Sequence, residues 1–128
     1  MNRKRTDASP ANLTAAMDAL VHGYREELEI YSTVRALTWS QRRTLDQDWN
    51  LDRFCDLLDE KQDLLQMIGQ IESVMKSAKS LVLTRDLAQC PDRWKLERLL
   101  DQLTILIEEI REVEGANATL LEDAMAVS

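Results

Sequence analysis

The sequence predicts an all-α protein, an elongated antiparallel three-helix bundle or coiled coil. First, the 128 residues include only three Gly and two Pro, and the abundant Leu, Glu, Asp, Arg and Gln keep their rotamer freedom in helices. Second, apolar residues recur at alternating steps of three and four along three long stretches. At 1.5 Å per residue each stretch makes a rod of about 50 Å. Short turns between such rods make consecutive helices antiparallel neighbours.

The chain is expected to form one domain over residues 11–128, preceded by a disordered basic tail over residues 1–10. The tail sequence, MNRKRTDASP, is polar and cannot bury enough surface to order itself. The first helix is predicted over approximately residues 12–46. Its apolar positions follow one helical stripe: Leu13, Met17, Leu20, Tyr24, Leu28, Tyr31 and Val34.

The second helix is predicted over residues 50–83, with Asn50 as the N-cap because its side-chain oxygen can accept from a free amide of the first turn. Its seam is the most regular in the chain: Phe54, Leu57, Lys61, Leu64, Ile68, Ile71, Met75, Ala78 and Val82. Only Lys61 breaks it. Gly69 costs about 1 kcal/mol against Ala in a helix interior, and tight helix packing is the favoured explanation for it.

The third helix is predicted over residues 91–126, with Pro91 as its first residue because a missing amide costs nothing there. Its seam contains one polar residue, Asn117: Leu99, Leu103, Leu106, Ile110, Val113, Asn117, Leu120 and Ala124. Further apolar residues widen this face: Leu96, Leu100, Ile107, Leu121 and Met125. The extra width suits a docking groove for a partner helix, or equally a closed core or a homodimer seam.

Composition argues against several classes of function. The formal net charge of −7 repels phosphate backbones, so nucleic-acid binding is not expected. Without a long apolar run we expect no membrane insertion and a cytoplasmic location. Cys55 and Cys90 form no CxxC pair and are expected to be reduced thiols, with Cys55 a small core residue.

No catalytic or cofactor-binding motif is recognisable, so we expect neither an enzyme nor a metal or cofactor site. A di-iron bundle needs Glu-x-x-His pairs, whereas the single histidine, His22, has no Glu three residues before it. Three scattered Gly cannot build a phosphate loop. Seven carboxylates lie between Asp46 and Asp63. Such a run usually forms a solvated helix face, although it could also be a docking surface.

Two stretches carry a family resemblance. They are DWNLDRFCDLLDEKQDLLQMIGQI, residues 48–71, and LIEEIREVEGANATLLE, residues 106–122. The chain resembles the FlgN-like flagellar export chaperones in its helix layout, in a leucine-rich segment with "EK" before paired leucines, and in a late Asn followed by a leucine pair. The matching residues are Glu60, Lys61, Leu64, Leu65, Asn117, Leu120 and Leu121.

The resemblance implies a cytoplasmic type III export chaperone without a cofactor. Such a chaperone binds the helical ends of hook-filament junction (hook-associated) proteins, prevents their premature assembly and delivers them to the export apparatus. On this hypothesis the client-facing residues are Leu96, Leu100, Ile107, Leu121 and Met125, with Asn117 setting the register. Two alternatives stay open: a chaperone of another flagellar client such as the filament cap, and a structural homodimeric coiled coil.

Overall fold

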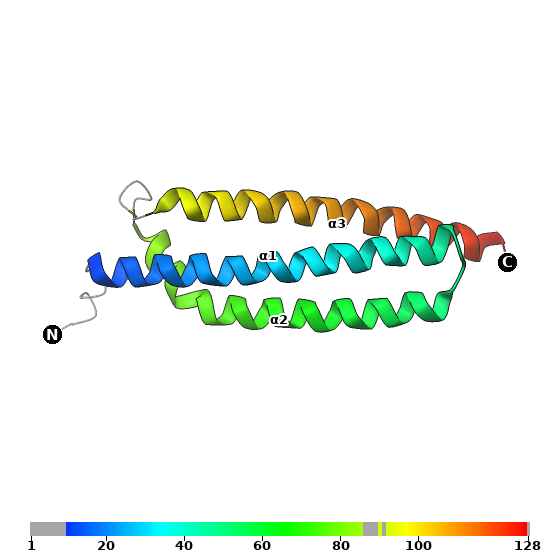
Figure 1. Ribbon diagram of the computed structural model, residues 1–128, viewed down its shortest axis with the longest axis horizontal. Coiled ribbons are helices and arrows are strands. Elements are labelled where there is room, and N and C mark those ends of the chain that lie inside the picture. The colour runs from blue at the N-terminus through cyan, green and yellow to red at the C-terminus, as the bar shows by residue number, and fades with distance from the viewer. Residues whose placement is uncertain (1–9, 86–89, 91, 128) are drawn as a thin grey trace.

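The computed structural model describes residues 10–85, 90 and 92–127. They form three antiparallel helices without a strand among the described residues: α1 (Pro10–Asp46), α2 (Leu51–Leu83) and α3 (Arg93–Val127). The molecule is a rod, with the three helices side by side (Figure 1). The predicted all-α three-helix bundle is confirmed, and the helix bounds lie within two residues of those predicted. The predicted tail lies outside the described residues except for Pro10, which already belongs to α1.

Helix α1 is the central element of the rod. It packs along its length against both α2 and α3, whereas the backbones of α2 and α3 come close at few points and these two helices meet mainly through long side chains (Figure 1). A helix with two partners must bury a wider face than a single seam provides. The buried positions of α1 therefore include polar side chains: Glu27, Thr38, Gln41 and Thr44. None of the three helices, within the described residues, is both long and apolar enough to cross a bilayer.

The starts of α2 and α3 are fixed by their local chemistry. Asn50 is the N-cap of α2, as predicted, since its Oδ1 accepts from the backbone amide of Arg53 at 3.0 Å. The prediction that α3 begins at Pro91 is wrong by two residues. Asp92 has a φ of 53°, a left-handed conformation that a right-handed helix cannot contain, so α3 begins at Arg93. Pro91 itself lies outside the described residues.

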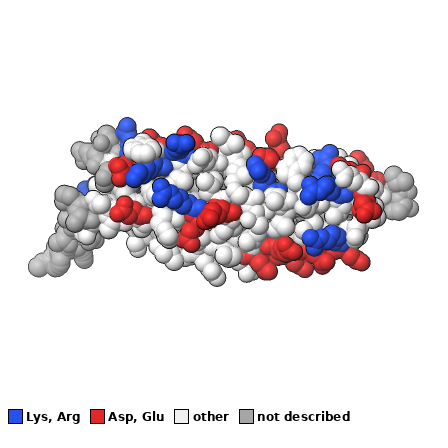
Figure 2. All heavy atoms as spheres, in the orientation of Figure 1, with Lys and Arg blue, Asp and Glu red and all other residues white. Residues whose placement is uncertain are grey.

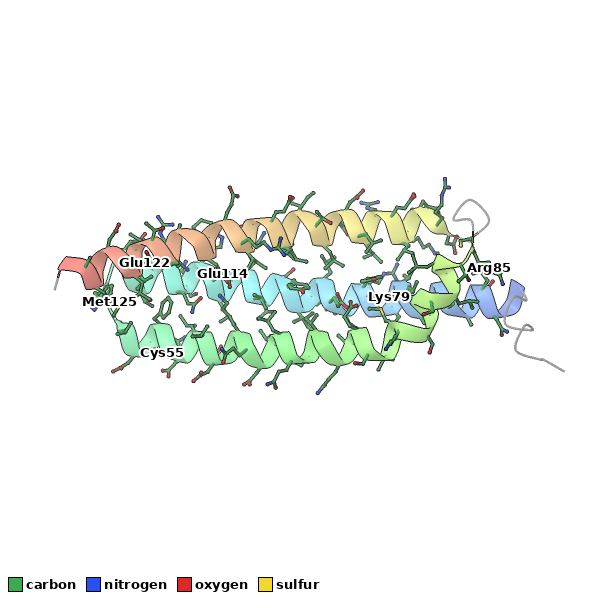
Figure 3. All side chains as sticks on the ribbon, turned by 180° about the vertical axis from the view of Figure 1, so that it is seen from behind. Cys55, Lys79, Arg85, Glu114, Glu122 and Met125 are labelled. Carbon is green, nitrogen blue, oxygen red and sulfur yellow. The ribbon has the colours of Figure 1, made fainter. Side chains whose placement is uncertain are left out.

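Two apolar clusters fill the space between the helices. The cluster near the start of α1 contains these buried residues: Ala16, Met17, Leu20, Met75, Val82, Cys90 and Leu96. The second lies further along α1 and α3, around Val34, Leu106 and Ile110. Cys90 thus belongs to the core, whereas Cys55 is exposed on α2 (Figure 3), and its expected core role is wrong. One residue turns a helix by about 100°, so Cys55 falls off the seam that Phe54 occupies.

The close approach of helices occurs at a different glycine from the one expected. No side chain or neighbouring backbone lies within 4 Å of a Cβ built on Gly69, so packing does not explain that residue. Gly23 of α1 is buried, and a Cβ there would overlap the Sδ and Cγ atoms of Met75 on α2. Because the Met75 side chain is itself buried, the absent Cβ of Gly23 allows α1 and α2 to pack closely.

The different surroundings of the two glycines predict opposite effects of a Gly→Ala substitution on the stability of the protein. Gly69→Ala removes backbone entropy from the unfolded chain without a clash and should stabilise the protein by about 1 kcal/mol. Gly23→Ala lowers the entropy of the unfolded chain in the same way, but overpacking against Met75 costs about 2 kcal/mol. The free energy of unfolding of this variant should therefore fall by about 1 kcal/mol. Urea unfolding followed by circular dichroism measures both changes. Equal stabilisation by the two variants would show that Gly23 is not a packing residue.

Candidate partner-binding surfaces

The apolar residues that widen the face of α3 divide into exposed, half-buried and buried positions. Leu100 and Met125 are 39% and 66% exposed, and Ile107 and Leu121 are half-buried. Leu96 is buried in the first apolar cluster, against residues of α1 and α2. A docking side chain must be able to reach a partner, so the expected client-facing role of Leu96 does not agree with its position. Its place in the core follows from the side chains of α1 and α2 that pack with it near the start of α3.

Asn117 faces the interior of the bundle. It is buried, and its Nδ2 donates to the backbone carbonyl of Thr38 on α1 at 3.2 Å. Its Oδ1 has no hydrogen-bond partner among the described residues. Asn117 can donate to the Thr38 carbonyl only when α1 and α3 are in this register. Asn117 therefore lies inside the bundle, apart from the residues expected to face a client, and its register-setting role stays a prediction.

Lys61 forms a polar centre that joins all three helices. Its side chain is only 3% exposed, and its Nζ donates to Gln41 Oε1 at 2.8 Å and to Glu114 Oε2 at 2.6 Å. Gln41 Nε2 in turn donates to the carbonyl of Phe54 at 3.4 Å. A buried ammonium is tolerated only with such partners. The sequence contained the signal, a single Lys in an apolar seam, but not the identity of the acceptors on the other helices.

The pair of Lys61 and Glu114 also shows which edges of α2 and α3 face each other. Residues three, four or seven positions apart share a helix face, so Leu58 and Leu65 lie along α2 on either side of Lys61. Ile107 and Leu121 lie likewise along α3 on either side of Glu114. We call the apolar residues along these facing edges the α2–α3 edge: Leu58, Leu65, Leu100, Ile107, Leu121 and Met125.

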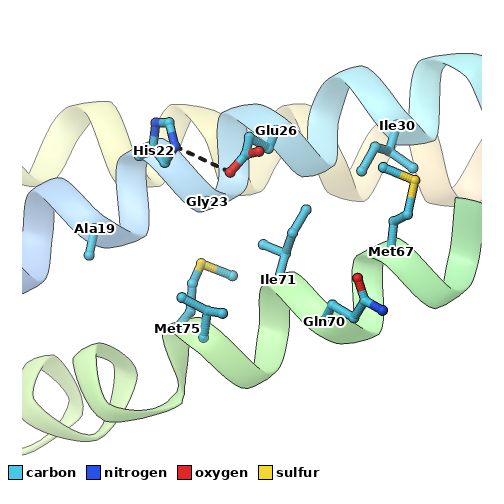
Figure 4. A pocket seen from close by; sticks show the side chains of 10 residues that line it. Ala19, His22, Gly23, Glu26, Ile30, Met67, Gln70, Ile71 and Met75 are labelled. Atoms are coloured by element: carbon cyan, nitrogen blue, oxygen red, sulfur yellow. Dashed lines mark ion pairs between the residues drawn. The ribbon is translucent and has the colours of Figure 1, made fainter.

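A groove of 370 Å³ lies between α1 and α2 (Figure 4). Its wall on α1 includes Ile30 and an ion pair between His22 Nε2 and Glu26 Oε1 at 3.2 Å. Its wall on α2 includes Met67 and Val74, which are 47% and 84% exposed. We call this feature the α1–α2 groove; its lining is Ala19, His22, Gly23, Glu26, Ile30, Met67, Gln70, Ile71, Val74 and Met75.

The groove and the α2–α3 edge lie on different sides of α2. Leu65 belongs to the α2–α3 edge and Met67 lines the α1–α2 groove. Two residues turn an α-helix by about 200°, so these side chains leave α2 in nearly opposite directions. The molecule therefore has two separate surfaces with exposed apolar side chains. The sequence pattern did not predict the α1–α2 groove, because its lining is shared between two helices.

A carboxyl pair with an unusual protonation state lies between α1 and α2. Burial, first, and a hydrogen bond to Glu72, second, together raise the pKa of Glu27 from 4.5 to about 8. The pKa of Glu72 is lowered, first by the hydrogen bond from Glu27 and then by its contact with Lys79, which also lies over the Tyr24 ring (Figure 3). Glu27 is therefore the proton donor of the pair at neutral pH. The carboxyl groups of α1 and α2 therefore meet with one proton between them.

Comparison with known proteins places the chain in one family. The family model described as "FlgN protein" matches residues 16–128. No curated protein and no solved structure matches the chain significantly. The matched range contains α2, α3 and all of α1 beyond its first six residues. The match therefore includes both surfaces and the Lys61 centre.

The Lys61 centre predicts an asymmetry between its two charged partners. Glu114→Gln leaves a buried ammonium without a carboxylate and should cost about 3 kcal/mol. Lys61→Met leaves Glu114, whose side chain is 45% exposed, in contact with water, and should cost only about 1 kcal/mol for the lost donor to Gln41. Urea unfolding gives both values, with exposed Glu112→Gln as the control. A larger cost for Lys61→Met than for Glu114→Gln would contradict the prediction.

Glu27 predicts a loss of stability as the pH rises. Between pH 4.5 and about 8 the unfolded chain ionises Glu27 while the folded chain keeps its proton, so the free energy of unfolding falls across this window. Glu72 titrates below this window because its pKa is lowered. Glu27→Gln can still donate to Glu72 and cannot ionise, so it should remove the fall and stabilise the protein above pH 8 by several kcal/mol, at about 1.4 kcal/mol for each pKa unit.

Urea unfolding across this pH range, followed by circular dichroism, measures the effect of Glu27. Exposed Glu29→Gln, two residues away on α1, is the control and should keep the pH dependence of the unchanged protein. The same pH dependence in Glu27→Gln would show that Glu27 is ionised in the folded state at neutral pH.

Proposed function

Since the chain belongs to the FlgN family and is a flagellar export chaperone, we propose that its clients are the hook-filament junction proteins. It binds their helical ends in the cytoplasm, prevents premature assembly and delivers them to the export apparatus. Family membership over residues 16–128 is the observation that carries this proposal. The exposed apolar surface of the rod supports it, because helical client segments need an apolar surface on which to dock.

The α2–α3 edge is the surface that we assign to the client. Leu65 on α2 and Leu100 on α3 are 42% and 39% exposed, and the backbones of α2 and α3 come close at few points. A client helix laid between them would cover apolar atoms from both helices and act as a fourth helix of the bundle. Each fully covered Leu side chain would contribute about 2 kcal/mol to binding before the entropic cost of association.

A structural homodimer is the second candidate function, because a second copy could cover the same apolar edge. The two candidates differ in what they need. A homodimer uses the edge without any client, whereas a chaperone leaves the edge free until a client arrives. The mass of the protein alone and with a client segment therefore separates them.

Substitutions along the α2–α3 edge test the client assignment. The double variant Leu100→Ser with Met125→Ser removes exposed apolar contact from α3 and should weaken client binding at least about tenfold. The control is Ile105→Ser, because Ile105 is 67% exposed but lies about 200° around α3 from Ile107. Co-purification with the terminal helical segments of hook-filament junction proteins, with mass by light scattering, measures binding.

A second double variant, Ile107→Ser with Leu121→Ser, tests the half-buried part of the edge, and its fold is checked by circular dichroism. Unchanged client binding by both folded double variants would remove the edge from the proposal. A stable homodimer that does not bind these client segments would favour the structural coiled coil. Binding of filament-cap segments, with no binding of hook-filament junction segments, would support the chaperone function but assign it a different client.

A further inference from the structure

The α1–α2 groove has an apolar lining that no part of the described chain covers. Val74 is among the most exposed apolar side chains of the described residues, at 84%, and Met67 lies on the same wall, two helical turns before it on α2. On the opposite wall Ala19 and Ile30 are eleven residues apart, so the groove is roughly 16 Å long. That length fits three turns of an α-helix.

The groove continues into a stripe of acidic residues on the same face of α2. Exposed residues of α2 at alternating steps of four and three share this face: Asp56, Glu60, Asp63, Met67, Gln70 and Val74. The first three are carboxylates and the last three belong to the groove. Acidic side chains gather over the N-terminal half of α2, and uncharged ones over its other half (Figure 2). The whole stripe is roughly 27 Å long.

The carboxylates of this stripe are not neutralised within the described chain. Asp56, Glu60 and Asp63 form no ion pair with any described residue. Lys61, the cation nearest in sequence, is buried and paired with Glu114. Arg43 and Arg53 line a pocket at the turn between α1 and α2 and likewise form no ion pair with the three carboxylates. The negative charge on this half of the stripe is therefore available to a partner.

We propose that the α1–α2 groove and its acidic extension bind an amphipathic helix of another protein, apolar in one half and rich in Lys or Arg in the other. The apolar half packs between Ile30, Met67 and Val74. The basic half pairs with the carboxylates and is steered towards them by the net charge of −7. The occupant is about 20 residues long, to match the stripe. This inference does not depend on the identity of the clients, because it concerns a separate side of α2.

A designed peptide tests the surface directly. The probe is a fluorescent helical peptide of about 20 residues, with Leu along one face of its first half and Lys along the same face of its second half. Fluorescence anisotropy with the full-length protein measures its affinity. A second peptide with Glu in place of each Lys should bind at least about tenfold more weakly, and added salt should weaken only the Lys peptide.

Two variants of the protein separate the halves of the surface. Met67→Ser with Val74→Ser removes the apolar half and should weaken binding of the Lys peptide at least about tenfold. The second variant, Asp56→Asn with Glu60→Gln and Asp63→Asn, removes the acidic half. It should also weaken binding of the Lys peptide at least about tenfold, and it should abolish the salt dependence of binding. All five positions are exposed, and thermal melts confirm that each variant folds.

The matched control removes the same number of carboxylates from exposed positions of α3 and should change the affinity less than about twofold. It is Asp101→Asn with Glu108→Gln and Glu112→Gln. Equal weakening by this control, or no binding of the Lys peptide to the unchanged protein, would overturn the proposal. A homodimer of the unchanged protein that dissociates on Val74→Ser would also overturn it, because a second copy would then be the occupant.

Discussion

The buried ammonium of Lys61 is the interaction on which the arrangement of the three helices depends. Its two acceptors come from different helices, Gln41 on α1 and Glu114 on α3. If either helix slid by one turn, about 5.4 Å, the ammonium would stay buried and lose an acceptor, which costs several kcal/mol. An apolar seam alone tolerates such slippage, since Leu can replace Leu in the next layer. The polar centre thus selects one register among several that the apolar seams allow.

The central position of α1 explains why the protein has exposed apolar surfaces at all. One helix with two partners leaves α2 and α3 with one well-covered side each, and their backbones come close to each other at few points. A closed bundle would bury Leu65 and Leu100 between them, whereas here both remain partly exposed. The same geometry leaves the α1–α2 groove open on the other side of α2. The surfaces that fit a binding protein are consequences of an incomplete bundle.

Individual residues show which features of the structure the sequence pattern could predict. It predicted Asn50 as a cap and the seam of α2, because capping and periodicity depend on residues close together in the chain. It could not tell Gly69 from Gly23, since the need for a missing Cβ arises from Met75 on another helix. It also placed Leu96 on the client surface with its neighbours, although side chains of α1 and α2 bury it.

The sequence by itself determined the all-α class, the number of helices, their bounds to within two residues, the family and the faces that carry apolar side chains. These follow from local preferences and from a period that each helix carries alone. Only the tertiary structure decided that α1 is central, that Lys61 pairs with Glu114, and that the α1–α2 groove stays open. The physical reason is that a helical period fixes which residues share a face, but the angles between helices decide which faces meet.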